Sequence, residues 1–575
     1  MLRKYANCQQ RLFRHLAWLC FIAGIATTAQ AYPTDTVAVS KGEQLFQTYC
    51  TACHNFSQKG IGPSLGRVSG QVPVAWLKAF IQNAPDVIAK GDARASQLYA
   101  DYKQMMPAFT NLDDASLDAI LLYINANQTK ESLKKRGPDG IKNPLPAPIA
   151  QSALVLQLDY YATAPASASA APLARINKMG VLPGPKERVF VLDLRGKLYD
   201  ITAGDWQVAL DMQQQRPDFI NVPGLGTGFG SFAFHPDFYK NGLLYTTHTE
   251  RPRSAVADFA YADSIKVTLQ WVLTEWRMTN PDATALSGKG RELMRINMVS
   301  PIHGVQEIAF NPTAKQGSDD YGLLYLSTGD GGASENGYSF LCADKHNPWS
   351  SVWRIDPLAR NSRNKQYGIP PTNPFALDKD PATVREIYCR GFRNPNRLSW
   401  TPTGQLLITD IGHANIEELN LAIAGADYGW PKREGTFVIT PGGRMDQVYA
   451  LPGTETAPSA TPLYVYPVAQ YDHDEGKAIS GGFVYSGTEI PALNGKYVFG
   501  DVNNGRLFGV NAAQLTLGKQ AVIEEFKLLI EGKQTTFQTI SGREKPDVRF
   551  GMGANGTLFV LTKSDGKIYR IKDAR

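Results

Sequence analysis

Apolar and polar positions alternate along the chain in two different ways. Between residues 40 and 127 the apolar positions recur at helical spacing. One predicted helix lies over 42–49, where Leu45, Phe46 and Tyr49 share a face. A second helix follows the acidic pair Asp113-Asp114, and its apolar positions are Leu117, Ile120, Leu121 and Ile124. The region 40–127 is therefore predicted to be helical.

From residue 173 onward the pattern changes to short apolar strands separated by turns rich in Gly, Asn and Asp. A unit of strand, polar turn and second strand recurs at 189–199, 232–245, 308–325, 398–407, 482–499 and 548–560. A single sheet of this kind exposes two apolar faces, which only neighbouring sheets can cover. Six recurrences over 173–575 predict an all-β, six-bladed propeller, and a β-sandwich with long loops is the alternative.

The segment 129–172 differs in composition from both regions. It contains the Pro-rich stretch 144–148 and a run of Ala, Ser and Pro over 162–172. Such a composition is typical of a semi-extended linker. A short apolar run at 154–158 is compatible with packing on either neighbour. We therefore expect a multidomain protein, with a small all-α domain over 32–128, a linker over 129–172 and the β-domain over 173–575.

The first 31 residues have the features of a secretory signal peptide. A basic stretch up to Arg14 precedes an apolar run over 16–26, and Ala29-Gln-Ala31 is typical of a cleavage site. An uncleaved membrane anchor is the alternative, but the apolar run is short for a bilayer. No other stretch is long and apolar enough, so we expect no stable membrane insertion after cleavage, and a periplasmic or secreted protein.

Charge and composition exclude several classes of protein. The 575 residues are 43% hydrophobic and 19% charged, which is typical of a globular chain rather than a disordered one. Removal of the four basic residues in the signal segment lowers the formal net charge from +6 to +2. A nucleic-acid-binding function is therefore not indicated.

A haem-attachment motif stands at Cys50-Thr-Ala-Cys53-His54. In this spacing two thiols form thioethers to the haem, and the adjacent His offers an imidazole nitrogen to the iron. A zinc site would require a second ligand pair nearby, and no further Cys occurs before Cys342. We therefore expect covalent haem c held by Cys50 and Cys53, with His54 as an iron ligand.

The sixth ligand of the iron is expected to be a methionine. Met106 precedes Pro107 in the segment Met105-Met-Pro-Ala-Phe109 and is the favoured ligand, with Met105 as the alternative. Residues 40–127 resemble the class I cytochrome c family in the order of helix, haem motif, Gly-Pro loop, Met-Pro segment and terminal helix. This resemblance implies a compact helical domain that carries one electron at a time.

Two further cysteines remain in the mature chain once Cys8 and Cys20 leave with the signal segment. Cys342 and Cys389 are far apart in sequence. An oxidising compartment would allow them to form one disulfide, whereas two separate buried thiols are the alternative.

Several stretches of the β-region resemble the glucose/sorbosone dehydrogenase family, whose soluble aldose dehydrogenases use pyrroloquinoline quinone (PQQ). The stretches that carry the resemblance are 224–238, His303 before a Phe-x-Pro strand, 326–332, 391–395, 418–421 and 427–431. They follow one another in the family's order over most of 175–575. The resemblance implies a six-bladed propeller that transfers hydride from a sugar to a quinone.

The resemblance also implies roles for particular residues. His303 matches the family's general base, and Asp330 matches the acid of the Gly-Asp turn beside it. Arg393 and Asn394 match the pair that holds the quinone carbonyls. Gly412 and His413 match a turn whose main-chain carbonyls hold calcium.

The chain departs from the family where the cofactor's carboxylates would bind. Where the family has basic residues after a late strand and an Arg-x-Arg-Asp pattern, this chain has Asp501-Val-Asn-Asn504 and Arg543-Glu-Lys-Pro-Asp547. The substitutes to consider are Lys477, Arg543, Lys545 and Arg549. The acidic run 471–477 lacks the spacing of an EF-hand and is interpreted as a loop.

The sequence as a whole indicates an exported quinohaemoprotein. We expect it to oxidise an aldose or a related hydroxyl compound and to pass electrons through a quinone to haem c. An external cytochrome or oxidase would then accept them. Two alternatives remain, namely an electron-transfer cytochrome with a non-catalytic docking propeller, and a propeller oxidoreductase with another substrate or cofactor.

Overall fold

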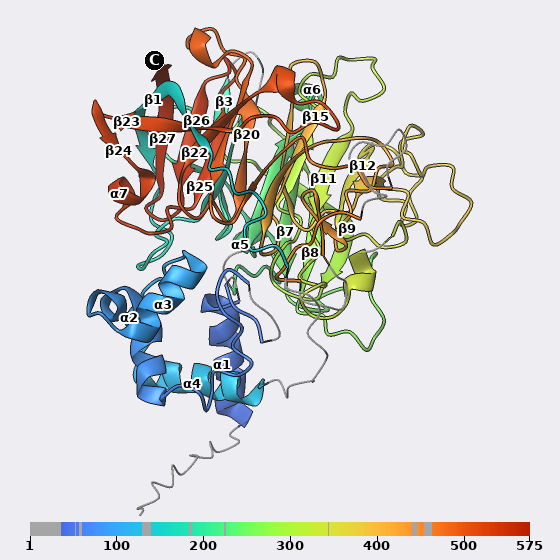
Figure 1. Ribbon diagram of the computed structural model, residues 1–575. Coiled ribbons are helices and arrows are strands. Elements are labelled where there is room, and N and C mark those ends of the chain that lie inside the picture. Colours follow the sequence, from blue (N-terminus) through green and yellow to red (C-terminus); the bar gives the residue numbers. More distant parts are fainter. Residues whose placement is uncertain are drawn as a thin grey trace, which may run out of the picture. The chain divides into compact units, whose positions relative to one another are not determined.

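The computed structural model describes residues 36–51, 53–56, 60–128, 140–182, 184, 187–223, 226–342, 344–439, 445–452 and 463–575. They form a helical domain, blue in Figure 1, and a large β-domain, coloured from teal to red. This confirms the two classes of structure expected from the sequence. The predicted signal segment over 1–31 lies outside the described residues.

The helical domain contains α1 (Thr36–Tyr49), α2 (Val74–Ala89), α3 (Ala93–Tyr102) and α4 (Asp114–Ala126). Helices α1 and α4 pack at Gly42, where a Cβ atom would lie 1.9 Å from the carbonyl oxygen of Ala119. Asp113 caps α4 by accepting a hydrogen bond from the Ser116 N–H at 2.8 Å. The two helices predicted from apolar spacing are thus present.

Within the described residues the β-domain has six groups of four hydrogen-bonded strands. The first group is β2 (Ile176–Leu182), β3 (Arg188–Asp193), β4 (Lys197–Asp200) and β5 (Gln207–Asp211). The second is β6 (Phe229–Phe234), β7 (Leu243–Glu250), β8 (Leu269–Met278) and β9 (Gly288–Met298). The third is β10 (Glu307–Phe310), β11 (Leu324–Thr328), β12 (Ser351–Ile355) and β13 (Ile387–Arg390).

The later groups continue in chain order, with one exception. The fourth is β14 (Pro395–Trp400), β15 (Leu406–Asp410), β16 (Ile416–Leu421) and β19 (Ala469–Asp472). The fifth is β20 (Ile479–Val484), β21 (Lys496–Asp501), β22 (Leu507–Asn511) and β23 (Glu524–Ile530). The sixth is β25 (Val548–Met552), β26 (Leu558–Thr562), β27 (Lys567–Ala574) and, from far upstream, β1 (Ala150–Thr163).

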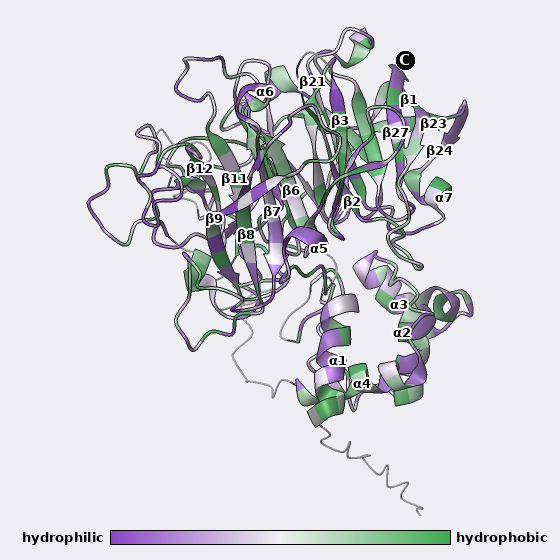
Figure 2. Cartoon of the chain, turned by 180° about the vertical axis from the view of Figure 1, so that it is seen from behind, coloured by the Kyte–Doolittle hydropathy of each residue, from purple (hydrophilic) through white to green (hydrophobic). Residues whose placement is uncertain are grey.

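Several short helices, turns and strands lie outside these six groups. They are α5 (Met212–Gln215), α6 (Phe238–Asn241), α7 (Phe537–Ser541), the 3-10 turns Ser339–Cys342, Pro491–Leu493 and Ala512–Gln514, the hairpin of β17 (Arg433–Glu434) and β18 (Phe437–Val438), and β24 (Lys533–Thr535). Figure 2 shows β3 largely in the apolar colour and the short helix α5, whose three glutamines are exposed, largely in the hydrophilic colour. No helix among the described residues is both long and apolar enough to cross a membrane.

The first strands of the six groups, here called the inner strands, contact one another. In chain order each of β2, β6, β10, β14, β20 and β25 packs against the next, and β25 packs against β2. The fifth, sixth and first groups are joined by strand pairing into one continuous sheet, whereas the other three groups are separate sheets. The loops that enter these inner strands consequently meet one another.

Strand β1 lies in the segment that was expected to be a linker. It pairs antiparallel with β27 and parallel with β23. Leu156 and Leu158, from the apolar run noted in the sequence, are fully buried in the resulting core. Residues 150–163 therefore belong to the β-domain, and the expected linker is shorter on this side.

The two cysteines of the β-domain are separate thiols. Cys342 lies in a 3-10 turn and accepts a hydrogen bond from the Ser334 hydroxyl, with 3.8 Å between oxygen and sulfur. Cys389 is fully buried in β13. Both are free, so the structure has the alternative of two buried thiols rather than the disulfide.

Candidate functional site

His303 and Asp330 form a hydrogen-bonded pair at the entrance to the third group of strands. His303 lies in the loop before β10, and Asp330 follows β11. The His303 Nδ1 atom is 2.7 Å from Oδ1 of Asp330, which also accepts the Gly332 N–H at 2.8 Å. Asp330 is fully buried. An ionised Asp330 makes Nδ1 the protonated nitrogen, which leaves Nε2 free to accept a proton.

The surroundings of His303 favour the neutral imidazole. Burial lowers the pKa of His303 below its ordinary 6.5, and the positive charge of Arg393 lowers it further. Asp330 opposes this shift without cancelling it. A neutral imidazole with one free nitrogen is the form that a general base requires.

Arg393 comes close to this pair through its backbone and its side chain. The Asp330 N–H donates to the Arg393 carbonyl at 2.8 Å, which ties the two loops together. The backbone N–H groups of Arg393 and Asn394 donate to the carboxylate of Asp410 at 2.9 and 2.6 Å. His303, Asp330 and Arg393, which the sequence places far apart, are thus brought together, and Asn394 lies beside them.

The Arg393 guanidinium is buried and has several partners. Nη1 donates to the Gly412 carbonyl at 2.6 Å, and Nη2 donates to the Glu335 carboxylate at 2.5 Å. Its carbon also lies 5.9 Å from the ring centroid of Trp430, within the range of a cation–π contact. Nε is buried without a hydrogen-bond partner among the described residues, and so is Oδ2 of Asp330. The site therefore retains both a donor and an acceptor for a bound group.

Glu335 is a site residue that sequence reasoning missed. The same oxygen that accepts from Arg393 lies 3.1 Å from Nδ1 of His413. Burial by itself raises the pKa of the Glu335 carboxyl, but Arg393 and the His413 hydrogen bond outweigh it, so the net pKa lies below the ordinary value. Glu335 is therefore a carboxylate that compensates the Arg393 charge. Its position five residues after Asp330, in the same glycine-rich loop, is the one signal that the sequence offered.

The turn predicted to hold calcium is fixed by a second buried acid. One oxygen of Glu434 accepts the backbone N–H groups of His413, Ala414, Asn415 and Ile416 at 2.8–3.1 Å. The Gly412 carbonyl, one of the predicted calcium ligands, accepts from Arg393 instead. Among the described residues no group of three or more His, Cys, Asp or Glu side chains is arranged to bind a metal. The calcium site stays a prediction.

The four basic substitutes considered for the cofactor's carboxylates are placed differently. Arg543 and Lys545 are exposed in the loop before β25, and Lys477 is half-buried. Arg549 lies on β25 with its side chain 9% exposed. Of the four, Arg549 is the one buried on an inner strand.

The haem motif lies at the end of α1. The His54 N–H donates to the Cys50 carbonyl at 2.9 Å, so one helical turn carries the two cysteines and the histidine. Nδ1 of His54 lies 2.8 Å from the Pro63 carbonyl, which orients the ring and leaves Nε2 for a metal. A Cβ atom on Gly62 would lie 2.5 Å from Cε1 of His54. These residues fit a covalently attached haem with His54 as a ligand.

The two methionines near Pro107 have different surroundings. Met106 packs against the apolar core of the helical domain, which includes Phe46, Leu117 and Ile120. Met105 is half-buried and is not part of this cluster. The packing of Met106 agrees with its assignment as sixth ligand, which stays a prediction.

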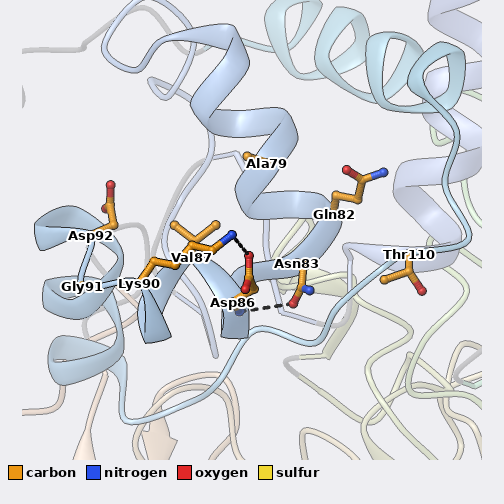
Figure 3. Close-up of a pocket in the computed structure, with 9 residues that line it drawn as sticks. All are labelled: Ala79, Gln82, Asn83, Asp86, Val87, Lys90, Gly91, Asp92 and Thr110. Carbon is orange, nitrogen blue, oxygen red and sulfur yellow. Dashed lines mark hydrogen bonds and ion pairs between the residues drawn. The ribbon is translucent and has the colours of Figure 1, made fainter.

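The helical domain also has a hollow of about 710 Å³ along α2, shown in Figure 3. Asn83, where α2 is interrupted, accepts a hydrogen bond from the Asp86 N–H at 3.2 Å, and Asp86 pairs with Lys90 at 2.7 Å. None of its lining residues belongs to the haem motif or to the β-domain. The hollow contains no set of groups suited to catalysis.

Comparison with known proteins confirms both resemblances. Residues 177–570 match the family model described as Glucose / Sorbosone dehydrogenase, and residues 39–128 match the model described as Cytochrome c. The HIPL1 protein of Arabidopsis thaliana is 29% identical over 346 residues, which are 52% of this chain and 47% of that protein. The quinoprotein glucose dehydrogenase B of Acinetobacter calcoaceticus is 26% identical over 280 residues, or 46% and 52% of the two chains.

More distant proteins match as well. The human Hedgehog-interacting protein is 24% identical over 358 residues, covering 60% of this chain and 43% of that protein. The chain thus spans about half the length of the curated relatives it matches. A PQQ-bound aldose sugar dehydrogenase from Streptomyces coelicolor is structurally similar, with 18% identity, a TM-score of 0.48 and coverage of 75% and 100% of the two chains. A cytochrome c from Rhodothermus marinus is 32% identical over 16% of this chain and 79% of its own, with a TM-score of 0.16.

Proposed function

This chain belongs to the glucose/sorbosone dehydrogenase family, and on that premise we propose that it oxidises an aldose or a related hydroxyl compound and passes the electrons to its own haem c. The observation that carries the proposal is the His303–Asp330 pair beside Arg393, in a chain that also has a haem-attachment motif. A quinone is the proposed cofactor, because one relative is named a quinoprotein glucose dehydrogenase and the site retains a buried donor on Arg393.

In the proposed reaction the protein's own residues move a proton and orient the reacting groups. Nε2 of His303 takes the proton from the substrate hydroxyl. Asp330 keeps the imidazole in orientation and stabilises the positive charge that then forms on it. The Arg393 guanidinium would donate to the oxygen on which negative charge develops. When bound, the quinone supplies a carbon that accepts the hydride from the sugar.

The helical domain gives these electrons an outlet. Hydride delivers two electrons together, whereas a haem iron removes them one at a time. A covalent tether between the domains keeps the acceptor near the donor at an effective concentration of roughly millimolar for a short linker. An external cytochrome or oxidase would reoxidise the haem. Since the attachment of c-type haem and the N-terminal segment both suit export, we also propose a periplasmic or secreted location.

The arrangement of the β-domain is part of the proposal. The six groups of strands, with inner strands that contact one another in chain order, support a six-bladed propeller. His303, Asp330 and Arg393 would then stand around one end of its axis. Calcium bound by main-chain carbonyls at Gly412 and His413 would assist the quinone.

A second function has an observation in its favour. Glu335 already compensates the charge of Arg393, and the family's basic pattern near 501–504 and 543–547 is altered. Such a site suits a cytochrome whose β-domain docks a partner without catalysis. This alternative predicts no quinone binding and no substrate-dependent reduction of the haem.

The first experiment uses the purified full-length holo-cytochrome with added quinone and calcium. Haem absorbance is followed with a panel of sugars and alcohols. We expect substrate-dependent haem reduction, and a His303→Ala variant should lower its rate by roughly 10²- to 10⁴-fold with an unchanged haem spectrum. His346→Ala is the matched control, because His346 forms a similar pair with Asp380 at 3.0 Å on the surface.

The outcomes separate the two functions. Equal rates in wild type and His303→Ala would remove the catalytic role of His303. A wild type that binds no quinone and shows no reduction with any substrate would favour the docking module.

A further inference from the structure

A group of buried basic side chains lies on the inner strands and is not used in the proposed reaction. We call it the basic cluster. Its cations are Lys178, Arg397, Arg549 and Lys563, and its acids are Glu307 and Asp547. The exposed fractions of the cationic side chains are 6–16%. When all four are protonated, the cations outnumber the two carboxylates by two, and even with Lys563 neutral three cations face two carboxylates.

Glu307 is shared between two of the cations. Lys178 forms an ion pair with it and also donates to the Ser231 hydroxyl at 3.0 Å and the Ile308 carbonyl at 2.8 Å. Arg397 lies 3.5 Å from the other oxygen of Glu307. One carboxylate therefore serves two positive charges on β2 and β14.

Asn177 links this half of the cluster to the other half. Its carbonyl accepts from Nη2 of Arg397 at 2.8 Å, and its side-chain oxygen accepts from Nε of Arg549 at 3.2 Å. Arg549 in turn pairs with Asp547 at 2.8 Å. The four cations thus belong to one connected set.

Lys563 is the least compensated member. Its ammonium lies 3.5 Å from Oδ1 of Asp547, longer than a normal charged hydrogen bond, and the same oxygen already pairs with Arg549. The side chain is 6% exposed. Burial lowers the pKa of Lys563 well below its ordinary value, and the charge of Arg549 lowers it further. A buried ammonium in this position would gain most from a neighbouring anion.

The cluster adjoins the candidate catalytic site. Glu307 follows His303 by four residues, and Arg397 follows Arg393 by four, so each separation is at most about 13 Å along an extended chain. Gln306, which lies between His303 and Glu307, accepts a hydrogen bond at 3.3 Å from the amide of Asn396, which lies between Arg393 and Arg397. A ligand near His303 is thus within reach of the basic cluster.

We propose that the basic cluster, through Lys563 and Arg549, binds a carboxylate of the anionic quinone cofactor. This inference rests on the proposed function. The family's basic pattern is altered near 501–504 and 543–547. Arg543 and Lys545 remain there but are exposed, so we look for buried partners for the carboxylates of the quinone. One bound carboxylate offsets the positive charge that is in excess when Lys563 is neutral, and a second one offsets the proton that Lys563 then takes up. An acidic sugar is the other source of a carboxylate at this place, and the experiment separates the two.

The test is direct quinone binding to the full-length protein, measured by equilibrium dialysis at pH 7 without substrate. Lys563→Met removes the charge and keeps most of the length of the side chain. We expect binding to weaken by roughly 10- to 100-fold, which is the range for loss of a charged hydrogen bond. Lys533→Met, at an exposed position on β24, is the matched control and should bind like wild type. Lys563→Arg should restore binding to within a few-fold.

Two further measurements test the charge itself. The methyl ester of PQQ lacks the carboxylate charges, so wild type and Lys563→Met should bind it with similar affinity. Anion binding should also draw a proton onto Lys563, because a nearby negative charge raises a lowered lysine pKa. Calorimetry in buffers of different ionisation enthalpy should detect proton uptake in wild type and less in Lys563→Met.

The outcomes distinguish this inference from the proposed function. Quinone binding that is equal in wild type and Lys563→Met overturns the inference, while substrate-dependent haem reduction would keep the proposed function. Wild type that binds no quinone overturns both. If Lys563→Met weakens the use of glucuronate relative to glucose and leaves quinone binding intact, the carboxylate belongs to the substrate and the assignment to the cofactor is wrong. Lys563→Met should fold normally, because it removes a buried amine whose ion-pair partner Asp547 is 3.5 Å away.

Discussion

Replacement of Glu335 by Gln isolates the charge that compensates Arg393. The two side chains are 14% and 9% exposed, and their charged atoms are 2.5 Å apart. Gln has the shape of Glu and still offers an oxygen to Arg393 and His413. What Glu335→Gln removes is the negative charge, so that Arg393 is left as a buried cation without a charged partner.

The size of the effect follows from the hydrogen bonds that remain. Loss of a partner from a buried ion pair costs about 3–5 kcal/mol when the remaining charge has no other contact. Gln retains an acceptor, and the Gly412 carbonyl still accepts from Arg393. We therefore expect a loss of about 1.5–3 kcal/mol in the free energy of unfolding of the β-domain, the range for a hydrogen bond to a charged group.

The lowered pKa of Glu335 also predicts how the stability difference between wild type and Glu335→Gln changes with pH. The pKa of Glu335 is lower in the folded protein than its ordinary value of about 4.3 in an unfolded chain. Its contribution to stability is therefore complete above that value and is lost as the pH falls through the folded-state pKa. The difference between wild type and Glu335→Gln should be largest near pH 7 and should shrink below about pH 4.

Urea unfolding of the β-domain, followed by tryptophan fluorescence, measures this stability difference at pH 7 and again below about pH 4. Haem absorbance reports the helical domain separately, which keeps the two transitions apart. Glu489→Gln, at an exposed position, is the matched control and should leave the midpoint unchanged. Equal stability of wild type and Glu335→Gln at pH 7, or a difference that grows with acid, would refute the reasoning.

Two further predictions concern the reacting groups. Because burial and Arg393 lower the pKa of His303, the acidic limb of substrate-dependent haem reduction should lie below pH 6.5, and Arg393→Gln should move it upward; an unmoved limb would contradict the role of Arg393. Met106→Ala should abolish the thioether–iron absorbance band and lower the reduction potential, whereas Met105→Ala should leave both unchanged; the reverse result would shift the ligand by one residue.

The elements that sequence reasoning identified are those fixed by local spacing. Cys50 and His54 are one helical turn apart, so their joint use follows from the motif without knowledge of the fold. The apolar face of α4 is likewise contained in four positions of one helix. The proximity of His303 and Arg393 could not be predicted from local spacing, since they are 90 positions apart. Only the resemblance to a family with the same order of motifs anticipated it.

Strand β1 and Glu335 show why the rest was not predictable. The residues of β1 are flanked by stretches rich in Pro, Ala and Ser, which dominate the local composition and are typical of a linker. Its partners β23 and β27 lie at the other end of the chain, so its pairing leaves no local signal. Glu335 stands in Ser-Glu-Asn-Gly, which is typical of a turn, and Arg393 is 58 positions further along the chain, so the ion pair leaves no local signal.

The surroundings of Arg393 and those of Lys563 favour different chemical groups of a ligand. At Arg393 a protein carboxylate already balances the cation, so this position favours a group with partial negative charge, such as a carbonyl oxygen, over a full anion. At Lys563 the balance is incomplete, so this position favours a carboxylate. A flat molecule with carbonyl oxygens at one end and carboxylates at the other would therefore have a preferred orientation, with its carbonyl end toward His303. Glu335→Gln should weaken that preference, because it would make Arg393 a competing site for the carboxylates.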